Sequence, residues 1–409
     1  MRFSMFCRWQ AVLFISILFC SCNHSPKLGL YVHDKKILNY LIYMAADNNL
    51  ERFAIKNIKA LQKIGSSKNV NILVLFDRSP GYDKSEDNRT GSDLFYITEN
   101  PKNMNDDIIC EFEELDMTDS ENLYDFLKTA NEFFPSDRIV LDIWSHGRGV
   151  YPDGIIAKGV VEDYTTGYGA ANTMAICDLT NAIRRFENET AKKLDIIHFD
   201  CCDMQMVEIA YQLKGLTDYV VGAETEIPGS GSDYKSIAEY LKSTEYKADE
   251  LSSFLVESFY DFQKNSSIDF ACSALKTSAF SEFVVAFNSF CDSLIFVLNE
   301  KQLELKSIRD DLLPTDSAYA EFVDFVQFAN SCSSLGLDAS VLMNAYSSLV
   351  PVSFATDSLK GKFGGLGINF PHTEKERGYY VKSDANNDIF DFYSDTKWDE
   401  FLSVYWLSL

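Results

Sequence analysis

The stretch IIHFDCCDMQMVEIA, residues 196–210, reads as a buried strand that ends at a carboxylate, followed by two cysteines and an amphipathic helix. The mostly apolar run before Asp200 predicts a strand covered on both faces, which is typical of a parallel sheet in an α/β protein. In an open parallel sheet, ligands bind beyond the carboxyl ends of the strands. Cys201 and Cys202 therefore stand where this class of fold places its reactive groups.

The chain on both sides of this stretch alternates between apolar runs and helical segments. Further strands are expected at 37–47, 69–77, 137–146 and 218–224, and helices at 49–64, 123–134, 177–189, 206–216 and 235–242. This alternation predicts an α/β core over 37–242, built on a mostly parallel sheet. The pattern over 243–409 is mainly helical, with segments at 248–264, 280–302, 319–331 and 398–407 and a strand at about 362–371 that returns to the core.

The composition supports a large core and argues against one class of partner. Hydrophobic residues make up 46% of the 409 residues, and the formal net charge is −24. Binding to nucleic acid depends on clustered Lys and Arg that release counterions from the phosphates. The evenly acidic chain therefore predicts no nucleic-acid partner.

The N-terminus has the features of a secretory signal. A basic flank precedes a short apolar run at 11–19, which is too short to span a bilayer as a helix. Residues 1–21 are therefore expected to be a signal peptide. Its end resembles a bacterial lipobox, which predicts a lipid on Cys22, a tether over 22–36 and a lipid-anchored, extracytoplasmic place in the cell envelope, periplasmic or at the cell surface. A cleaved signal that releases a soluble protein is the alternative.

The cysteines do not form a disulfide pattern. Seven follow Cys22, without a CxxC pair or regular spacing. An odd, irregular set is not a disulfide framework, although the expected compartment would permit one. Most are expected to be small buried hydrophobic residues.

A second strand end completes a candidate catalytic pair. The strand at 137–146 ends at His146, upstream of the thiols by a caspase-like interval. The helix that follows the thiols would favour the thiolate, and a neighbouring imidazole would move its proton. Gly147 lets a substrate carbonyl approach closely, so that its N–H and that of the nucleophile would hold an oxyanion. The pattern favours amide hydrolysis, although a cysteine after an apolar strand is more often a packing residue.

Six motifs carry a family resemblance, in order and in spacing. They are YMAADNNLE (43–51), WSHGRG (144–149), IIHFDCCDMQMVEIAYQL (196–213), AETEIPGSG (223–231) and, later, FVDFVQFA (322–329) with GLGINFP (365–371). Together they resemble the clostripain-like cysteine peptidases, which belong with caspases, gingipains and legumains. The resemblance runs from about residue 38 to 371 and implies a caspase-like α/β/α sandwich with a catalytic core over 37–242.

The resemblance also implies roles for single residues. His146 matches the catalytic histidine and Cys202 matches the nucleophile, whereas Cys201 takes the place of the family's alanine and is expected to pack in the core. Gly147 matches the glycine of the oxyanion site. Asp200 matches the acid that the family appears to use in its pocket for a basic P1 side chain.

Two departures bear on specificity. Arg148 stands where the family has more glycine, and Ser230 replaces an acid of the family's Pro-Gly-Asp-Gly loop. A carboxylate is the natural partner of a substrate Arg or Lys. Cleavage after Arg or Lys remains the expectation, and Glu224, Glu226 or Asp233 are candidates to supply the missing charge.

Two further expectations concern processing and cofactors. The family includes zymogens that cut themselves between the histidine and the cysteine; here 154–173 reads as a loop, and Lys158 is the candidate cut. The alternative is an ordinary surface lysine. His198 and Asp200 lack ligands at a separate position, so no metal site is predicted from them. Calcium supports some relatives, but there is no EF-hand loop, and Ca²⁺ is left open.

The sequence therefore predicts an envelope cysteine endopeptidase with protein or peptide substrates and a lipid anchor in the membrane. The main alternative is a catalytically degenerate relative that binds peptides without cleaving them. A lipid-anchored structural protein is the second.

Overall fold

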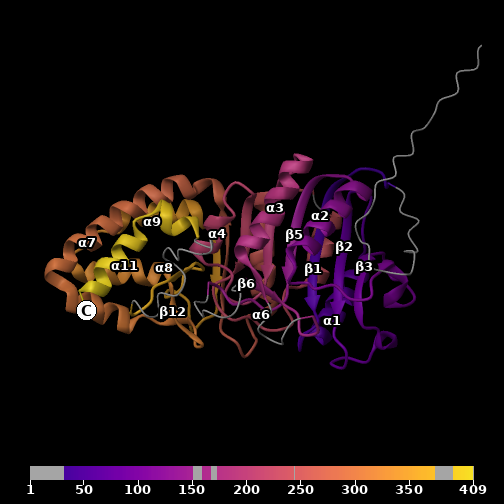
Figure 1. The fold of residues 1–409 in the computed structure, drawn as a ribbon, viewed down its shortest axis with the longest axis horizontal. Coiled ribbons are helices and arrows are strands. Elements are labelled where there is room, and N and C mark those ends of the chain that lie inside the picture. The colour runs from indigo at the N-terminus through magenta and orange to yellow at the C-terminus, as the bar shows by residue number, and fades with distance from the viewer. Residues whose placement is uncertain (1–31, 151–158, 167–172, 244, 374–389, 409) are drawn as a thin grey trace, which may run out of the picture.

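A nine-stranded sheet forms the centre of the molecule, ordered β13-β10-β9-β8-β5-β1-β2-β3-β4 in the computed structural model (Figure 1). The structure describes residues 32–150, 159–166, 173–243, 245–373 and 390–408. The sheet strands are β1 (Lys36–Ala46), β2 (Val70–Arg78), β3 (Gly91–Tyr96), β4 (Ile108–Glu111), β5 (Ser136–Trp144), β8 (Leu194–Asp200), β9 (Thr217–Ala223), β10 (Ala271–Lys276) and β13 (Val352–Ala355). The run from β2 through β1, β5 and β8 to β9 is parallel, and both edges are antiparallel. The expected mostly parallel α/β sheet is confirmed.

Helices cover both faces of this sheet. On one face lie α1 (Glu51–Gln62), α5 (Tyr234–Ser243) and α6 (Ala248–Gln263), and on the other lie α2 (Ser120–Phe133), α3 (Ile176–Thr190) and α4 (Val207–Gln212). Because side chains alternate along a strand, Tyr40 and Ile42 of β1 join the first core while Leu41 and Tyr43 join the second. Burial on both faces explains why the central strands read as continuous apolar runs.

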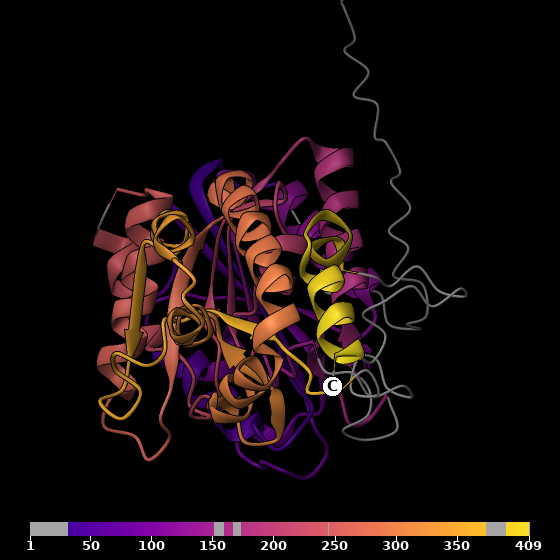
Figure 2. The ribbon, with the colours of Figure 1, turned by 90° about the vertical axis from the view of Figure 1, so that its left-hand side faces the viewer.

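The C-terminal elements gather at the β13 end of the sheet (Figures 1 and 2). They are α7 (Phe280–Asp311), α8 (Phe325–Ser331), α9 (Ser340–Leu349), α10 (Asp391–Asp395) and α11 (Trp398–Leu407), with a small sheet of β11 (Pro314–Asp316), β12 (Tyr319–Asp324) and β14 (Gly367–Asn369). By length and composition alone α7 is apolar enough to cross a membrane. Its buried Phe283 and Phe287, however, pack against Phe325 and Trp398 with tilted rings, as in the core helix of a globular domain.

The structure differs from the sequence expectation at several short elements. The helix expected at 319–331 begins as strand β12, because Asp324 caps α8 by accepting the N–H of Gln327 at 2.6 Å. The strand expected at 362–371 is the short β14, which pairs with β12. Its link to the core is the Gly367 N–H, which donates to the Gln205 carbonyl at 2.9 Å. The 243–409 range also contributes β10 and β13 to the main sheet.

Candidate active site

Two neighbouring strand ends form the candidate site. β5 and β8 are parallel neighbours in which Trp144 pairs with Asp200, so the segments that follow leave the sheet at the same edge. A Cβ on Gly147 would lie 2.2 Å from the Cys202 carbonyl oxygen. The His146–Gly147 and Cys201–Cys202 segments are therefore in direct backbone contact, and only glycine fits at this crossing.

The His146 side chain is half-buried and held by one neighbour. Its Nε2 lies 2.7 Å from Oδ1 of Asn49, on the segment that follows β1. When Nε2 carries the ring hydrogen and donates it to Asn49, Nδ1 is left as a proton acceptor. Burial lowers the pKa of His146 below 6.5, assisted by Arg148 and opposed by Glu162. At neutral pH the imidazole is therefore uncharged and able to accept a proton.

The Cys202 thiol is protonated in the resting protein. Its Sγ is half-buried and accepts one weak hydrogen bond, from the Ile227 N–H at 3.4 Å. Burial, and then the Asp203 carboxylate, raise the pKa of the thiol to about 12. The helix expected to favour the thiolate is the six-residue α4, which starts only at Val207. That expectation is wrong, because Cys202 lies before the helix N-terminus at Val207, and burial together with the Asp203 carboxylate disfavours the thiolate.

The two adjacent cysteines lie on opposite faces of the sheet. Cys201 is fully buried in the α2–α3–α4 core, where its Sγ lies 3.1 Å from the Ile143 carbonyl oxygen. Cys202 packs against the other core, on the same side as Asp200. Among the described residues, no disulfide joins any of the seven cysteines. Cys201 is therefore a packing residue, as the sequence predicts.

Two backbone N–H groups at the crossing are open. Within the described residues, neither the Gly147 N–H nor the Cys202 N–H has a hydrogen-bond partner. The neighbours of Gly147 are engaged instead, since Arg148 N donates to the Gly159 carbonyl and Val161 N to the His146 carbonyl. Two unpaired donors beside a thiol and an imidazole are suited to hold a negatively charged oxygen.

Asp200 lies beside a recess next to the thiol. A small recess is lined by His198, Asp200 and apolar side chains that include Ile227, whose N–H contacts the Cys202 Sγ. Asp200 is 4% exposed, and its Oδ2 accepts from the Ser232 N–H at 2.9 Å and the Tyr234 hydroxyl at 3.0 Å. Its Oδ1 has no partner among the described residues.

The charge of Asp200 is set by a buried polar network. Burial raises its pKa to about 6; a nearby histidine lowers it and the carboxylate of Asp142 raises it. The histidine is His198, whose Nδ1 lies 3.0 Å from Asp142 Oδ2. Tyr40 also donates to Asp142, at 2.7 Å. His198 is thus a core histidine whose ring is hydrogen-bonded within the protein.

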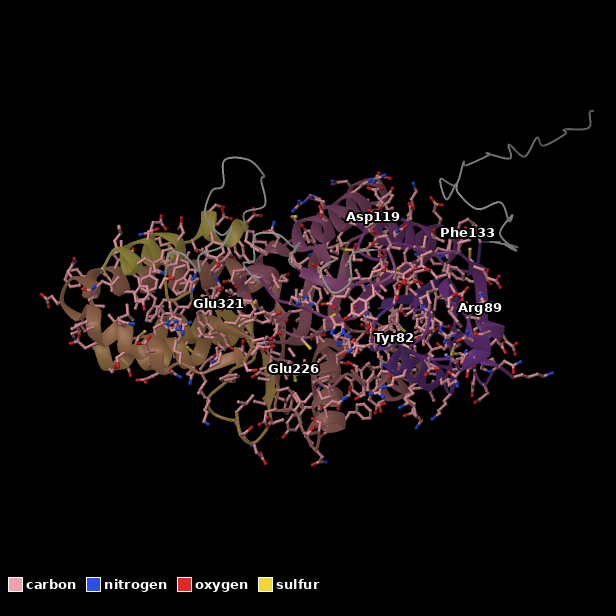
Figure 3. All side chains as sticks on the ribbon, turned by 60° about the horizontal axis from the view of Figure 1, so that its bottom comes forward. Tyr82, Arg89, Asp119, Phe133, Glu226 and Glu321 are labelled. Carbon is pink, nitrogen blue, oxygen red and sulfur yellow. The ribbon has the colours of Figure 1, made fainter. Side chains whose placement is uncertain are left out.

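The three candidates for the missing acid lie in different surroundings. Glu224 is buried, and burial followed by repulsion from Asp324 raises its pKa well above its usual range. Asp233 caps the first turn of α5, accepting from Ser236 N. Glu226 is the exposed one of the three, and its charge contributes to the raised pKa of Cys202. Figure 3 places Glu226 between Tyr82 and Glu321.

The segment that joins the two strand ends forms an arm beside the site. Its described part contains β6 (Gly159–Glu162) and β7 (Thr173–Ala175), where the sequence predicts a loop. Val160 pairs with Gly147, and the buried Glu162 carboxylate binds Arg148 Nε at 2.5 Å. Arg148, a departure from the family pattern, thus ties the arm to the rim of the site. Lys158 and Cys22 lie outside the described residues.

The sequence analysis assigns no role to Asn49, although Asn49 holds the histidine. It lies within the quoted YMAADNNLE motif, where a polar pair after a strand end is a signal for a site residue. Nor does it foresee a cluster of four carboxylates in the same region, formed by Asp47, Asp77, Glu114 and Asp163. Asp47 and Asp77 lie at or near the ends of β1 and β2. Acidic residues at these two strand ends are the feature of the sequence that could have revealed the cluster.

Comparison with known families places the chain in one of them. A family model described as the clostripain family matches residues 42–406. The curated protein clostripain of Hathewaya histolytica is 27% identical over 227 residues, which is 50% of this chain and 42% of that protein. The match thus spans less than half the length of that curated relative.

Solved structures share the fold. An inactive zymogen C11 protease of Parabacteroides distasonis matches with a TM-score of 0.64 and 20% identity, over 91% of this chain and 99% of that one. A secreted C11 cysteine protease of Bacteroides thetaiotaomicron, bound to an irreversible peptide inhibitor, matches with a TM-score of 0.62 and 21% identity. The match covers 90% of this chain and 99% of that one. At these identities the likeness confirms the α/β/α architecture.

Proposed function

This chain belongs to the clostripain family, and on that premise we propose that it is a cysteine endopeptidase that cleaves after Arg or Lys. The observation that carries the proposal is the backbone contact between the His146–Gly147 and Cys202 segments at two adjacent strand ends. A thiol, a neutral imidazole and two open N–H donors are the parts that acyl transfer needs.

The proposed reaction begins from a neutral pair. Cys202 Sγ attacks the scissile carbonyl carbon as His146 takes the thiol proton, and the Gly147 and Cys202 N–H groups hold the oxyanion. When the C–N bond breaks, His146 gives the proton to the leaving amine. A water molecule, deprotonated by the same imidazole, then releases the acyl group from the thiol.

The resting thiol gives a pH-dependent prediction. Because burial and Asp203 raise the pKa of Cys202 to about 12, the reactive thiolate fraction grows with pH throughout the neutral range. We expect the rate of Cys202 alkylation by iodoacetamide, followed by peptide mass spectrometry, to keep rising through pH 9. Cys110, half-buried on β4, is the reference in the same sample. A plateau already below pH 7 would mean a preformed thiolate and contradict the prediction.

We also propose self-processing at Lys158. The arm that follows this lysine starts beside the site, since the Gly159 carbonyl accepts from Arg148 N at 3.0 Å and Val160 pairs with Gly147. The expected result is a two-fragment protein with a new N-terminus at Gly159, seen by denaturing electrophoresis and N-terminal sequencing.

Two variants separate self-processing from cutting by another protease. Lys158→Ala and Cys202→Ala should each stay a single chain, whereas Lys193→Ala, at an exposed lysine paired with Asp218, should be cut normally. Full activity without a start at Gly159 would remove the proposal.

The location is proposed from the N-terminal sequence. Cleavage before Cys22 and acylation of its thiol would anchor the mature chain by lipid to the envelope, with protein or peptide substrates in the same compartment. Mass spectrometry of the mature N-terminal peptide tests this directly, because an unmodified N-terminus beyond Cys22 would mean a released, secreted protein.

The function itself is tested by turnover. The purified protein should cut peptides after Arg or Lys, and alanine at Cys202 should abolish the cutting. Peptide binding without turnover would favour the degenerate relative, whose support is the high pKa of the thiol and the loss of the loop acid at Ser230.

A further inference from the structure

Two buried acids and a buried histidine lie together beside the candidate site. Asp142 of β5 pairs in register with His198 of β8, and Asp200 follows His198 by two residues, so it lies on the same face of the strand. His198 Nδ1 is 3.0 Å from Asp142 Oδ2. Among the described residues, no Lys or Arg forms an ion pair with either acid. The histidine is therefore the one basic group that can offset their charge.

The two acids differ in how their oxygens are occupied. Asp142 Oδ2 accepts from the Tyr40 hydroxyl at 2.7 Å and from His198 Nδ1. The Tyr234 hydroxyl lies 3.2 and 3.3 Å from the two Asp142 oxygens and 3.0 Å from Asp200 Oδ2. A phenol has one hydrogen, so Tyr234 donates to one acid at a time. Asp200 Oδ1 has no partner in the described part of the chain, which leaves it for a substrate.

The surroundings of the His198 ring suit its charged form. Nδ1 faces the Asp142 carboxylate, and Nε2 lies 3.5 Å from the Ser232 hydroxyl oxygen. An imidazolium donates from both nitrogens, and here each nitrogen faces an oxygen that can accept. Burial lowers the pKa of His198, but the charge and the hydrogen bond of Asp142, and then the charge of Asp200, raise it, and the net shift is upward.

The other elements around this group add little charge. Apart from the two tyrosines, α6 and β9 present apolar side chains to the recess, among them Phe259 and Val221. The Cys201 thiol lies on the opposite face of the sheet. Within the described residues, the charge of the group is therefore set by two acids and one imidazole.

The sum of these charges fits a pocket for one cation. Two carboxylates that share a buried space resist ionising together, because like charges repel. A positive charge on His198 offsets one of them and leaves one negative charge, which a substrate cation can neutralise. Burial raises the pKa of Asp200 to about 6, and attraction to His198 opposes this rise. Without that attraction Asp200 would hold its proton at higher pH and lose its affinity for a cation.

We propose that His198 is a positioning residue: as an imidazolium paired with Asp142, it keeps Asp200 in the ionised form that binds a basic P1 side chain. The charges of His198 and Asp200 are properties of the resting protein. Their effect on the choice of substrate rests on the proposed function.

The first test measures these charges without any change to the group. It uses Cys202→Ala protein, which cannot digest itself, with signals assigned through the backbone resonances. NMR of ¹⁵N-labelled histidine at pH 7 should show His198 protonated on both ring nitrogens. NMR of ¹³C-labelled aspartate should show the Asp200 carboxyl titrating at about pH 6. A neutral His198 ring, or a protonated Asp200, at pH 7 would overturn the proposal.

The second test removes the charge of His198 in the same protein. His198→Asn keeps a donor near the position of Nδ1, and the titration of Asp200 should move upward by about one pH unit or more, as on the loss of a nearby opposite charge. His372→Asn is the matched control, because His372 also pairs with an aspartate, Asp310, at 3.4 Å, but lies outside the group. It should leave the titration of Asp200 in place. An unmoved titration in His198→Asn would overturn the proposal.

The third test uses turnover by the protein with Cys202 intact. The preference for lysine over norleucine at P1, as a ratio of kcat/KM values, should fall about 5-fold at pH 6 in His198→Asn, as an upward shift of about one pH unit requires. It should return to the parent value at pH 8.5, where Asp200 is ionised in both proteins. A preference unchanged at pH 6, or lowered equally at both pH values, would overturn the proposal. No turnover by any protein, with the NMR results as expected, would remove the proposed function and leave the charge pair standing.

Discussion

Replacing Cys202 by alanine is expected to lower the kcat for peptide hydrolysis by at least about 10⁴-fold, the scale seen when a covalent nucleophile is removed. The remaining parts, His146 and the two N–H donors, still polarise a bound carbonyl but have no atom to form the acyl intermediate. Stability should change little, since the half-buried Sγ accepts only the 3.4 Å contact from Ile227 N. The measurement is turnover of a peptide with Arg or Lys at P1, alongside thermal unfolding.

The neighbouring cysteine provides the control. Cys201→Ala removes a fully buried thiol that lies 3.1 Å from the Ile143 carbonyl, so we expect a loss of about 1–2 kcal/mol in the free energy of unfolding with turnover largely kept. The opposite pattern, in which a folded Cys201→Ala protein is inactive and Cys202→Ala is active, would overturn the assignment of the nucleophile.

Asp200→Asn is expected to lower kcat/KM for substrates with Arg or Lys at P1 by about 10²-fold, because a buried charge pair that loses one partner costs a few kcal/mol. Asp200 Oδ1 is without a partner in the described residues, next to the recess beside the thiol, and would pair with the substrate cation. Asparagine has the same shape and can still accept from Ser232 N and the Tyr234 hydroxyl.

The readout for this variant is the difference between two substrates. A peptide with norleucine at P1 has the length of lysine without its charge, and its kcat/KM should change less than about 3-fold if Asp200 acts by charge. Glu226→Gln removes the exposed candidate charge near the thiol and is measured on the same two substrates. Equal losses on both substrates in Asp200→Asn would mean a structural role and contradict the prediction.

Local sequence patterns were sufficient to predict the central strands and the residues at which they end. Continuous apolar runs identified the parallel strands β1, β2, β5, β8 and β9, because these are buried on both faces. The antiparallel edges β3, β4, β10 and β13 were missed, since they are short and their pairing depends on distant segments. The first part of the helix expected at 319–331 is strand β12 instead. The cause is local, because Asp324 caps α8, and apolar periodicity does not reveal this cap.

The sequence by itself determined the fold class and the position of His146 and Cys202 at the ends of parallel strands. These follow from local periodicity and from the rule that parallel strands end at one edge. Only the tertiary structure decided the protonation of the thiol, the support of His146 by Asn49 and the meeting of Asp47 with three other acids. The physical reason is that pKa values and ligand clusters depend on burial and on through-space distances between segments far apart in the chain, which local patterns do not encode.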